Sequence, residues 1–200
     1  MKTNVFNLTL AIATICLMLV AGCEKDDNPL TPEPNAPKGL SACKAWIAFQ
    51  LSTGGNNGDL YSIWSNSDTK LNRQGMITEA EGCWNLTYSH VWGKEYKGSN
   101  PGWDKGTHQD NYGTYTPLNQ ILNFDSYEAM RVADANGGSA YAEVWSMTVA
   151  SGNGNVFGQP GETFWVIIYK IIDKDKDDAR RLFLINARTG IFFKRINFLS

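Results

Sequence analysis

The two halves of this sequence repeat one order of elements, and that order constrains the fold more than any other feature. In each half an apolar stretch with helical spacing ends at a glycine pair, Gly54-Gly55 or Gly137-Gly138, and predicted strands follow. One strand of each half also carries the pattern Trp-x-x-x-Tyr, at 84–88 and at 165–169. The sequence therefore predicts an α+β fold with helices packed on antiparallel sheet, as two tandem units or as one merged sheet.

In the first half, helical periodicity predicts a helix over 39–51, and strands are expected at 59–65 and 82–92. Within the second of these strands, large apolar side chains alternate with smaller ones, which is typical of a half-buried strand, and His90 is expected to be packed. The stretch 93–117 is rich in Gly, Asn, Asp, Lys and Tyr and lacks a period. We therefore expect a long loop there.

In the second half, the clearest helix is expected within 123–138, with Asp125 as its N-cap and Glu128 as the partner in a capping box. Four strands should follow, at 141–150, 163–172, 180–187 and 191–198. The second of them is apolar on both faces and should be central, and the last two should form a hairpin at Thr189-Gly190.

The unit 123–200 resembles the PepSY family in three short motifs. They are the helix motif with its following glycine (Ser126, Glu128-Ala129, Ala133, Gly137), the strand motif (Trp165, Tyr169) and the closing hairpin (Asn186-Ala187-Arg188-Thr189-Gly190). The family usually has Asp where this chain has Asn186. The resemblance implies one helix laid across an antiparallel sheet, similar to cystatin-like folds, and a role in binding or in restraining secreted peptidases. It implies no catalytic residues. The preceding unit, 39–122, matches this pattern only in outline.

The first residues resemble the signal of a bacterial lipoprotein. Residues 1–22 hold a basic start and an apolar run that ends in small residues directly before Cys23. The resemblance implies that Cys23 is acylated, palmitate being one such chain, and that the protein is anchored to a membrane by lipid. Lys25-Asp26-Asp27 resembles the export signal of Bacteroidetes lipoproteins, which implies the outer face of the outer membrane; the alternative is the periplasmic face. Residues 23–38 form a proline-rich tether.

Two cysteines remain beyond the signal peptide and the lipid site, Cys43 and Cys83. In an oxidising compartment a lone pair is most simply a disulfide, which would stabilise the fold by about 3–4 kcal/mol in the chain-entropy model. The alternative is two buried free thiols.

The sequence contains no recognisable catalytic constellation, metal site or cofactor site. Neither cysteine has a partner at metal-binding spacing, and His90 and His108 are the only histidines. Either histidine could act with Asp104 or Asp110, but nothing places them together. The carboxylates that could be paired for glycoside hydrolysis have no distinguishing context; they are Glu79, Glu81, Glu95 and Glu143. A net charge of −2 does not favour nucleic acid.

Aromatic residues gather in and beside the predicted loop, and they are the candidate binding residues: Trp92, Tyr96, Trp103, Tyr112 and Tyr115. Exposed, they could stack on sugar rings or contact a protein partner; alternatively they fold back as a small satellite core. The sequence thus favours a lipid-anchored, non-catalytic binding module that acts on a protein or glycan partner and could restrain a peptidase. The alternative is a small cell-surface hydrolase acting on glycans or peptides.

Overall fold

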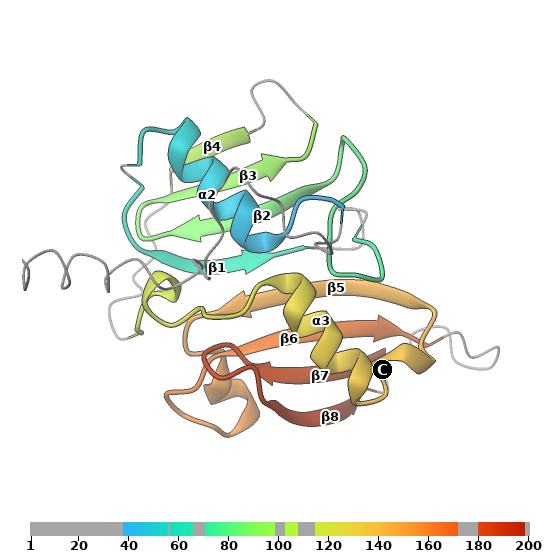
Figure 1. Ribbon diagram of the computed structural model, residues 1–200. Helices are drawn as coiled ribbons and strands as arrows, with labels where there is room; N and C mark the ends of the chain where they lie inside the picture. Colours follow the sequence, from blue (N-terminus) through green and yellow to red (C-terminus); the bar gives the residue numbers. More distant parts are fainter. Residues whose placement is uncertain are drawn as a thin grey trace, which may run out of the picture.

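The computed structural model describes residues 38–55, 57–65, 71–98, 103–107, 115–171 and 180–198. Figure 1 shows two helices lying across one large sheet. The elements of the first half are α2 (Ala42–Ser52), β1 (Leu60–Trp64), β2 (Cys83–Tyr88), β3 (Val91–Tyr96) and β4 (Trp103–Thr107). Those of the second half are α3 (Ser126–Ala135), β5 (Glu143–Ala150), β6 (Phe164–Lys170), β7 (Arg180–Asn186) and β8 (Phe192–Phe198). Three short 3₁₀ helices, η2 (Leu118–Gln120), η3 (Gly138–Ala140) and η4 (Asn153–Phe157), lie in the connections.

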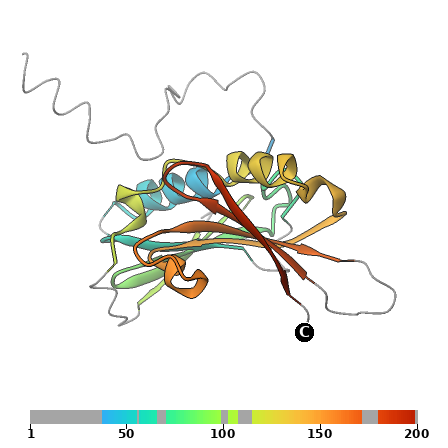
Figure 2. The same ribbon diagram turned by 90° about the horizontal axis from the view of Figure 1, so that it is seen from below.

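The eight strands form one antiparallel sheet in the order β4-β3-β2-β1-β5-β6-β7-β8. Both helices pack on the same face of this sheet, as the turned view shows (Figure 2). The predicted α+β class is confirmed, in the form of one merged sheet that carries both helices. Within the described part of the chain, no helix is long and apolar enough to cross a membrane.

The two halves are arranged as a pair of equivalent units joined edge to edge at β1 and β5. Reading outward from this seam, β1-β2-β3-β4 on one side mirrors β5-β6-β7-β8 on the other. Trp84 of β2 donates its indole N–H to the carbonyl of Leu40 (2.9 Å), directly before the N-cap of α2. Trp165 of β6 makes the same bond to Phe124 (2.8 Å), directly before the N-cap of α3. The two indoles meet edge to face across the seam, with centroids 6.5 Å apart.

The N-termini of the two helices meet at Asp125. This residue caps α3 in the predicted capping box with Glu128. Its Oδ1 accepts from the N–H of Ser126 (2.6 Å) and also from the N–H of Cys43 in the first turn of α2 (3.0 Å). One carboxylate therefore faces the positive ends of two helix dipoles, which favours its charged form. Burial raises the pKa of Asp125, and the groups that donate to it offset part of that rise.

The two halves fill the space under their helices with opposite combinations of side chains. Phe49 of α2 lies over Gly93 of β3, where an added Cβ would collide with the ring, and Phe49 stacks on Tyr88. At the equivalent positions α3 has Ala133 and β7 has Phe183, both fully buried. The large side chain thus comes from the helix in one half and from the strand in the other, which keeps both cores closely packed.

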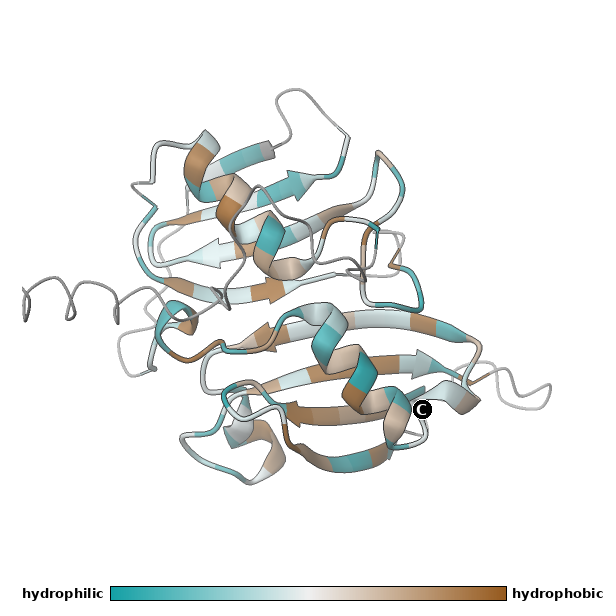
Figure 3. Cartoon of the chain, in the orientation of Figure 1, coloured by the Kyte–Doolittle hydropathy of each residue, from teal (hydrophilic) through white to brown (hydrophobic). Residues whose placement is uncertain are grey.

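The predicted strand 82–92 and the predicted loop 93–117 are corrected by the structure. The first strand ends at Tyr88, the chain turns at Ser89-His90, and β3 returns antiparallel to β2. His90 lies exposed in this turn rather than packed in a strand. The expected loop instead contains most of β3 and all of β4. The strand signal is weak there because these outer strands carry mostly polar residues, as the teal colouring of β3 and β4 shows (Figure 3).

The predicted bridge between Cys43 and Cys83 is also corrected, because Cys83 is a free, buried thiol. The pleat of β2 explains this. Trp84 points to the helix-covered face, so Cys83, the adjacent residue, points to the other face. Cys43 belongs to the core under α2, and the sheet separates the two side chains. Burial raises the pKa of the Cys83 thiol.

Candidate functional site

The sheet face opposite the two helices is the first candidate site; we call it the open face. Under the second half it is lined by a small apolar core of Phe164, Val166 and Leu184, against which Phe157 of η4 packs. Figure 2 shows η4 on this side of the sheet. Under the first half, on β1 to β4, the described chain places no helix on the open face. Side chains of these strands differ in exposure there: Trp64 and Trp92 are partly exposed, whereas Cys83 and Asn85 are buried.

Two tryptophans are the most exposed large side chains of the open face on β1 to β4. Trp92 of β3 is 41% exposed and Trp64 of β1 is 38% exposed. They share this face because Trp92 lies opposite Thr87, and Trp64 lies opposite Asn85 of the same strand β2. Their backbones are two strands apart and offset by two residues along β2, which gives roughly 12 Å at the usual strand spacing and rise. Such a spacing lets two indoles contact one extended or flat partner at the same time.

Neighbouring groups contact the Trp92 ring and the Trp64 backbone. The Trp92 indole lies across Gly106 of β4, whose missing side chain leaves room for the ring; an added Cβ would be 2.5 Å from it. The Trp64 carbonyl accepts from the buried side-chain amide of Asn85 (3.2 Å). An aromatic ring supported on a sheet loses little conformational freedom when it binds, which suits a contact surface.

Polar side chains complete this part of the open face. The Tyr96 hydroxyl donates to the Asp104 carboxylate of the edge strand β4 (3.0 Å). Burial and this hydrogen bond raise the pKa of Tyr96 to about 12, so the phenol remains neutral at physiological pH. Lys94 lies between Trp92 and Tyr96 on the same face, opposite Asp104. The surface therefore offers aromatic rings beside hydrogen-bonding groups of both charges.

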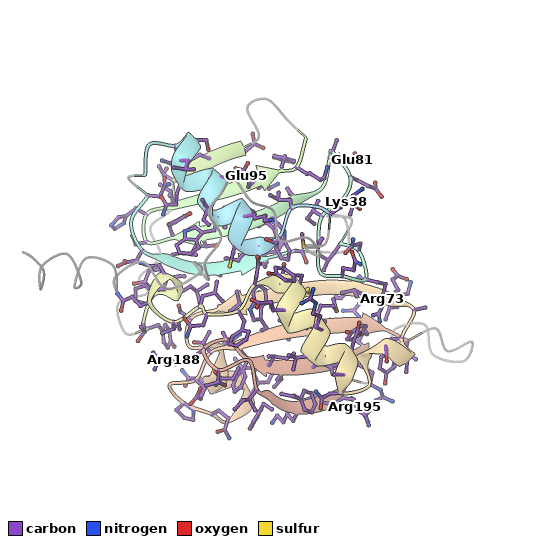
Figure 4. The ribbon with its side chains drawn as sticks, in the orientation of Figure 1. Lys38, Arg73, Glu81, Glu95, Arg188 and Arg195 are labelled. Atoms are coloured by element: carbon purple, nitrogen blue, oxygen red, sulfur yellow. The ribbon has the colours of Figure 1, made fainter. Side chains whose placement is uncertain are left out.

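A shallow hollow of about 240 Å³ lies at the ends of β5, β6 and β7. Its walls include Tyr115, Thr116, Glu162, Thr163, Asn186 and Arg188, and Figure 4 labels Arg188 at this end of the molecule. The Tyr115 ring lies against Gly152, which has a left-handed backbone and no side chain to obstruct it. This hollow is the second candidate site.

Polar groups of the hollow form hydrogen bonds that stabilise the turn after β7. Asn186 Oδ1 accepts from the N–H groups of Arg188 (3.0 Å) and Thr189 (2.9 Å), which closes the predicted hairpin turn. Its amide nitrogen donates to Glu162 (2.5 Å). An aspartate at this position would instead repel Glu162, which accounts for Asn186 in this chain. Glu162 and Arg188 are both exposed, so neither is a desolvated acid or base.

The structure brings together only part of the predicted aromatic cluster. Trp92 and Tyr96 share the open face, whereas Tyr115, 41% exposed, lies in the hollow. Trp103 lies in β4 with its backbone opposite Glu95. The remaining predicted site residues, Tyr112, Cys23 and Lys25-Asp26-Asp27, lie outside the described residues.

The residue that sequence analysis missed is Trp64. It ends the predicted strand 59–65, and its membership of the open face depends on which strands flank β1. The exposure of Trp64 could not be foreseen, because alternation in a short strand does not say which face is covered. Of the candidate catalytic residues, His90 is exposed in a turn and Asp104 is engaged by Tyr96; His108 and Asp110 lie outside the described residues. The described part of the chain therefore shows no contact between His90 and Asp104.

Comparison with known proteins leaves the family open. No protein-family model matches the sequence, and no curated protein matches it. Among solved structures, one similar chain is described as "a putative lipoprotein" from Clostridium difficile 630, with 11% sequence identity and a TM-score of 0.47. The match covers 82% of this chain and 97% of that one.

Proposed function

We propose that this protein is a lipid-anchored, non-catalytic binding module whose partner docks on the open face over Trp64 and Trp92. The observation that carries the proposal is the pair of exposed indoles on one face of β1 to β3, a face on which the described chain places no helix under the first half. Tryptophan is enriched at the energetic centres of protein interfaces because it combines a large apolar surface with a hydrogen-bond donor. The same chemistry suits stacking on sugar rings.

The anchor is the second part of this proposal and rests on the sequence. The apolar run before Cys23 supports acylation at that residue, and Lys25-Asp26-Asp27 supports transport to the outer face of the outer membrane. The proline-rich segment 23–38 would then separate the folded part from the lipid surface. Such an arrangement suits a protein that contacts partners outside the membrane.

The partner class that we favour is a secreted peptidase, held without being cleaved. The motifs shared with the PepSY family support this choice, since the family is linked to restraint of such enzymes. A glycan partner and the hydrolase alternative are outcomes that the experiment below distinguishes.

The docking face is tested by pulldown from source membranes with the intact protein and with a Trp64→Ala, Trp92→Ala double variant. We expect a partner that the double variant loses and that a Tyr115→Ala variant retains. The Tyr115 variant is a matched control, because Tyr115 is as exposed as Trp92 but lies in the hollow. Retention by the double variant with loss by Tyr115→Ala would move the site to the hollow.

The chemistry and the anchor need separate readouts. Binding to insoluble polysaccharide without a protein partner would indicate a glycan module, and turnover of a polymer abolished by His90→Ala or His108→Ala would indicate the hydrolase.

Cys23→Ala should prevent both lipid labelling and membrane attachment. Alanines at Lys25-Asp26-Asp27 should keep the anchor but remove accessibility to protease on intact cells; unchanged shaving would contradict surface export.

A further inference from the structure

The hollow at the ends of β5, β6 and β7 contains two opposite charges that do not pair with each other. Glu162 and Arg188 both line it, and both side chains are exposed. Within the part of the chain that the structure describes, no ion pair joins them, and the Arg188 guanidinium makes no hydrogen bond. The space between the two charged groups is therefore open to the polar groups of a ligand.

An aromatic ring forms another wall of the same hollow. The Tyr115 ring lies against the backbone of Gly152, where an added Cβ would collide with it. This contact covers one side of the ring, and the residue is still 41% exposed. Ile121, which is 7% exposed, also lines the hollow. The hollow thus presents a flat apolar surface next to its two charged groups.

Hydrogen bonds hold the walls of the hollow in position. The Ser151 hydroxyl donates to the carbonyl of Thr116 (2.8 Å), which fixes the segment that carries the tyrosine to the end of β5. The N–H of Gly152 donates to the hydroxyl of Thr163 (3.3 Å), directly before β6. The Asn186 amide described above connects the turn after β7 to the same segment before β6. Because the walls are already braced, a ligand would bind with little ordering of the protein.

The size of the hollow limits the ligand to a small one. Its volume is about 240 Å³. Pockets that enclose drug-sized ligands usually measure about 300–1,000 Å³. The hollow therefore has room for a single ring or for the end of a chain, and its shallow shape predicts weak binding.

The chemistry of the walls indicates a ligand that carries hydroxyl groups. The Glu162 carboxylate only accepts hydrogen bonds and the Arg188 guanidinium only donates them, whereas a hydroxyl does both. A sugar ring has hydroxyls around its rim and C–H groups on its faces, so it also matches the exposed surface of Tyr115. An acidic sugar would be repelled by Glu162 and an amino sugar by Arg188. An amino acid would satisfy both charges, but exposed charge pairs contribute little, and it has no flat face for the tyrosine.

We propose that this hollow is a binding site for one neutral sugar unit. The Tyr115 ring stacks on a face of the sugar, and Glu162 and Arg188 form hydrogen bonds with its hydroxyls. The site is separate from the open face, so the proposal does not depend on a partner at Trp64 and Trp92. A protein with both sites would hold a glycan and a protein partner at the same time.

The test uses the full chain with three neutral probes, the methyl glycosides of glucose, galactose and mannose, and with L-alanine as a zwitterion of opposite charges. Saturation-transfer NMR should detect at least one glycoside, with a Kd on the order of 1 mM. Tyr115→Ala should weaken this binding roughly tenfold, as expected for loss of a stacked ring, and Tyr115→Phe should retain it.

Two further variants test the charged walls, and one variant is the control. Glu162→Gln keeps an acceptor for Asn186 and removes the charge, and Arg188→Gln removes the guanidinium. Each should weaken glycoside binding severalfold. Trp92→Ala is the matched control, because Trp92 has the same exposed fraction as Tyr115 but lies on the open face, and it should leave glycoside binding unchanged.

Four results would overturn the proposal. They are no binding of any glycoside at about ten times the expected Kd, glycoside binding that Tyr115→Ala does not weaken, equal weakening by Trp92→Ala, and binding of L-alanine in preference to every glycoside. Glycoside binding that is lost in Tyr115→Ala and kept in the Trp64→Ala, Trp92→Ala double variant supports the proposal, whichever of these variants loses a protein partner.

Discussion

At the residue scale, Asp125 connects the two halves through a direct hydrogen bond. Its carboxylate accepts from the first turn of its own helix and from the first turn of α2. The neighbouring residue Ser126 makes a similar contact, since its hydroxyl accepts from the N–H of Ala42 at the start of α2 (3.1 Å). The N-terminal N–H groups of two helices are thus satisfied by one pair of neighbouring residues.

Asp125→Ala should therefore lower the free energy of unfolding by more than the loss of an ordinary N-cap does. We expect about 2–3 kcal/mol of unfolding free energy, because the variant removes the cap of α3 and leaves a buried N–H of α2 unpaired. Ser41→Ala removes the cap bond to Lys44 and a hydrogen bond to Asp125 but leaves the Asp125 carboxylate in place, so it should cost less, about 1–2 kcal/mol. Urea unfolding of both variants measures the difference. Equal losses would show that Asp125 serves α3 alone.

Glu95 should make stability fall as the pH rises. Burial raises its pKa from 4.5 to about 7, so the folded state binds the proton more tightly than the unfolded state does. The protonated residue is therefore tolerated at low pH, and stability is lost as the pH rises through about 7, by up to about 3 kcal/mol. Glu95→Gln removes this loss. In urea unfolding, the free energy of unfolding of the variant should rise relative to that of the native protein as the pH is raised from 5 to 8.5.

Glu81→Gln is the control for this pH effect, because Glu81 is exposed on the connection before β2. Its pH profile of stability should run parallel to that of the native protein. Parallel profiles for Glu95→Gln as well would mean that the Glu95 carboxyl is hydrated in solution.

At the scale of the elements, each helix and the strand beneath it carry facing side chains of complementary size. The first half combines Phe49 on the helix with Gly93 on the strand, and the second half combines Ala133 with Phe183. In the second half Phe183 packs edge to face on Tyr169, with centroids 5.2 Å apart. Each of these pairs thus contributes one phenylalanine ring to the space beneath its helix, from the helix in the first half and from the strand in the second.

This exchange predicts a rescue. Phe49→Ala should destabilise the protein by about 3–5 kcal/mol through the cavity that it leaves. Gly93→Phe should also destabilise it, because its ring would collide with Phe49. The double variant reproduces the arrangement of the second half and should be more stable than the sum of the single changes implies, by about 1–3 kcal/mol. A double-mutant cycle in urea measures this coupling, and additive losses would contradict it.

Elements with local signals were predictable from the sequence, whereas those defined by their neighbours were not. The capping box at Asp125 and the turn at Thr189-Gly190 lie where they were expected, because side chains near in sequence make these structures. β3 and β4 were missed since the turn at Ser89-His90 has no glycine, proline or asparagine and the outer strands are polar. Glu95 carried no local signal: only the strand register shows that it lies opposite Trp84, where Ile185 lies opposite the equivalent Trp165.

At the scale of the whole molecule, the two sides of the sheet differ in how their side chains are covered. The helix-covered side holds one continuous core to which both halves contribute. The other side is covered by η4 under the second half and presents tryptophans under the first. A sheet stabilised from one side leaves the opposite side free to vary in composition, which suits a module that presents a binding surface.

The shared core predicts that the two halves unfold together. The β1–β5 seam, the contact of Trp84 with Trp165 and the bonds at Asp125 all cross between the halves, so neither half should retain its structure alone. We expect one urea transition, superimposable by tryptophan fluorescence and circular dichroism. Phe49→Ala in the first half and Phe183→Ala in the second should each shift the whole transition. Two transitions, with each variant moving only one, would instead define 39–122 and 123–200 as independently stable domains.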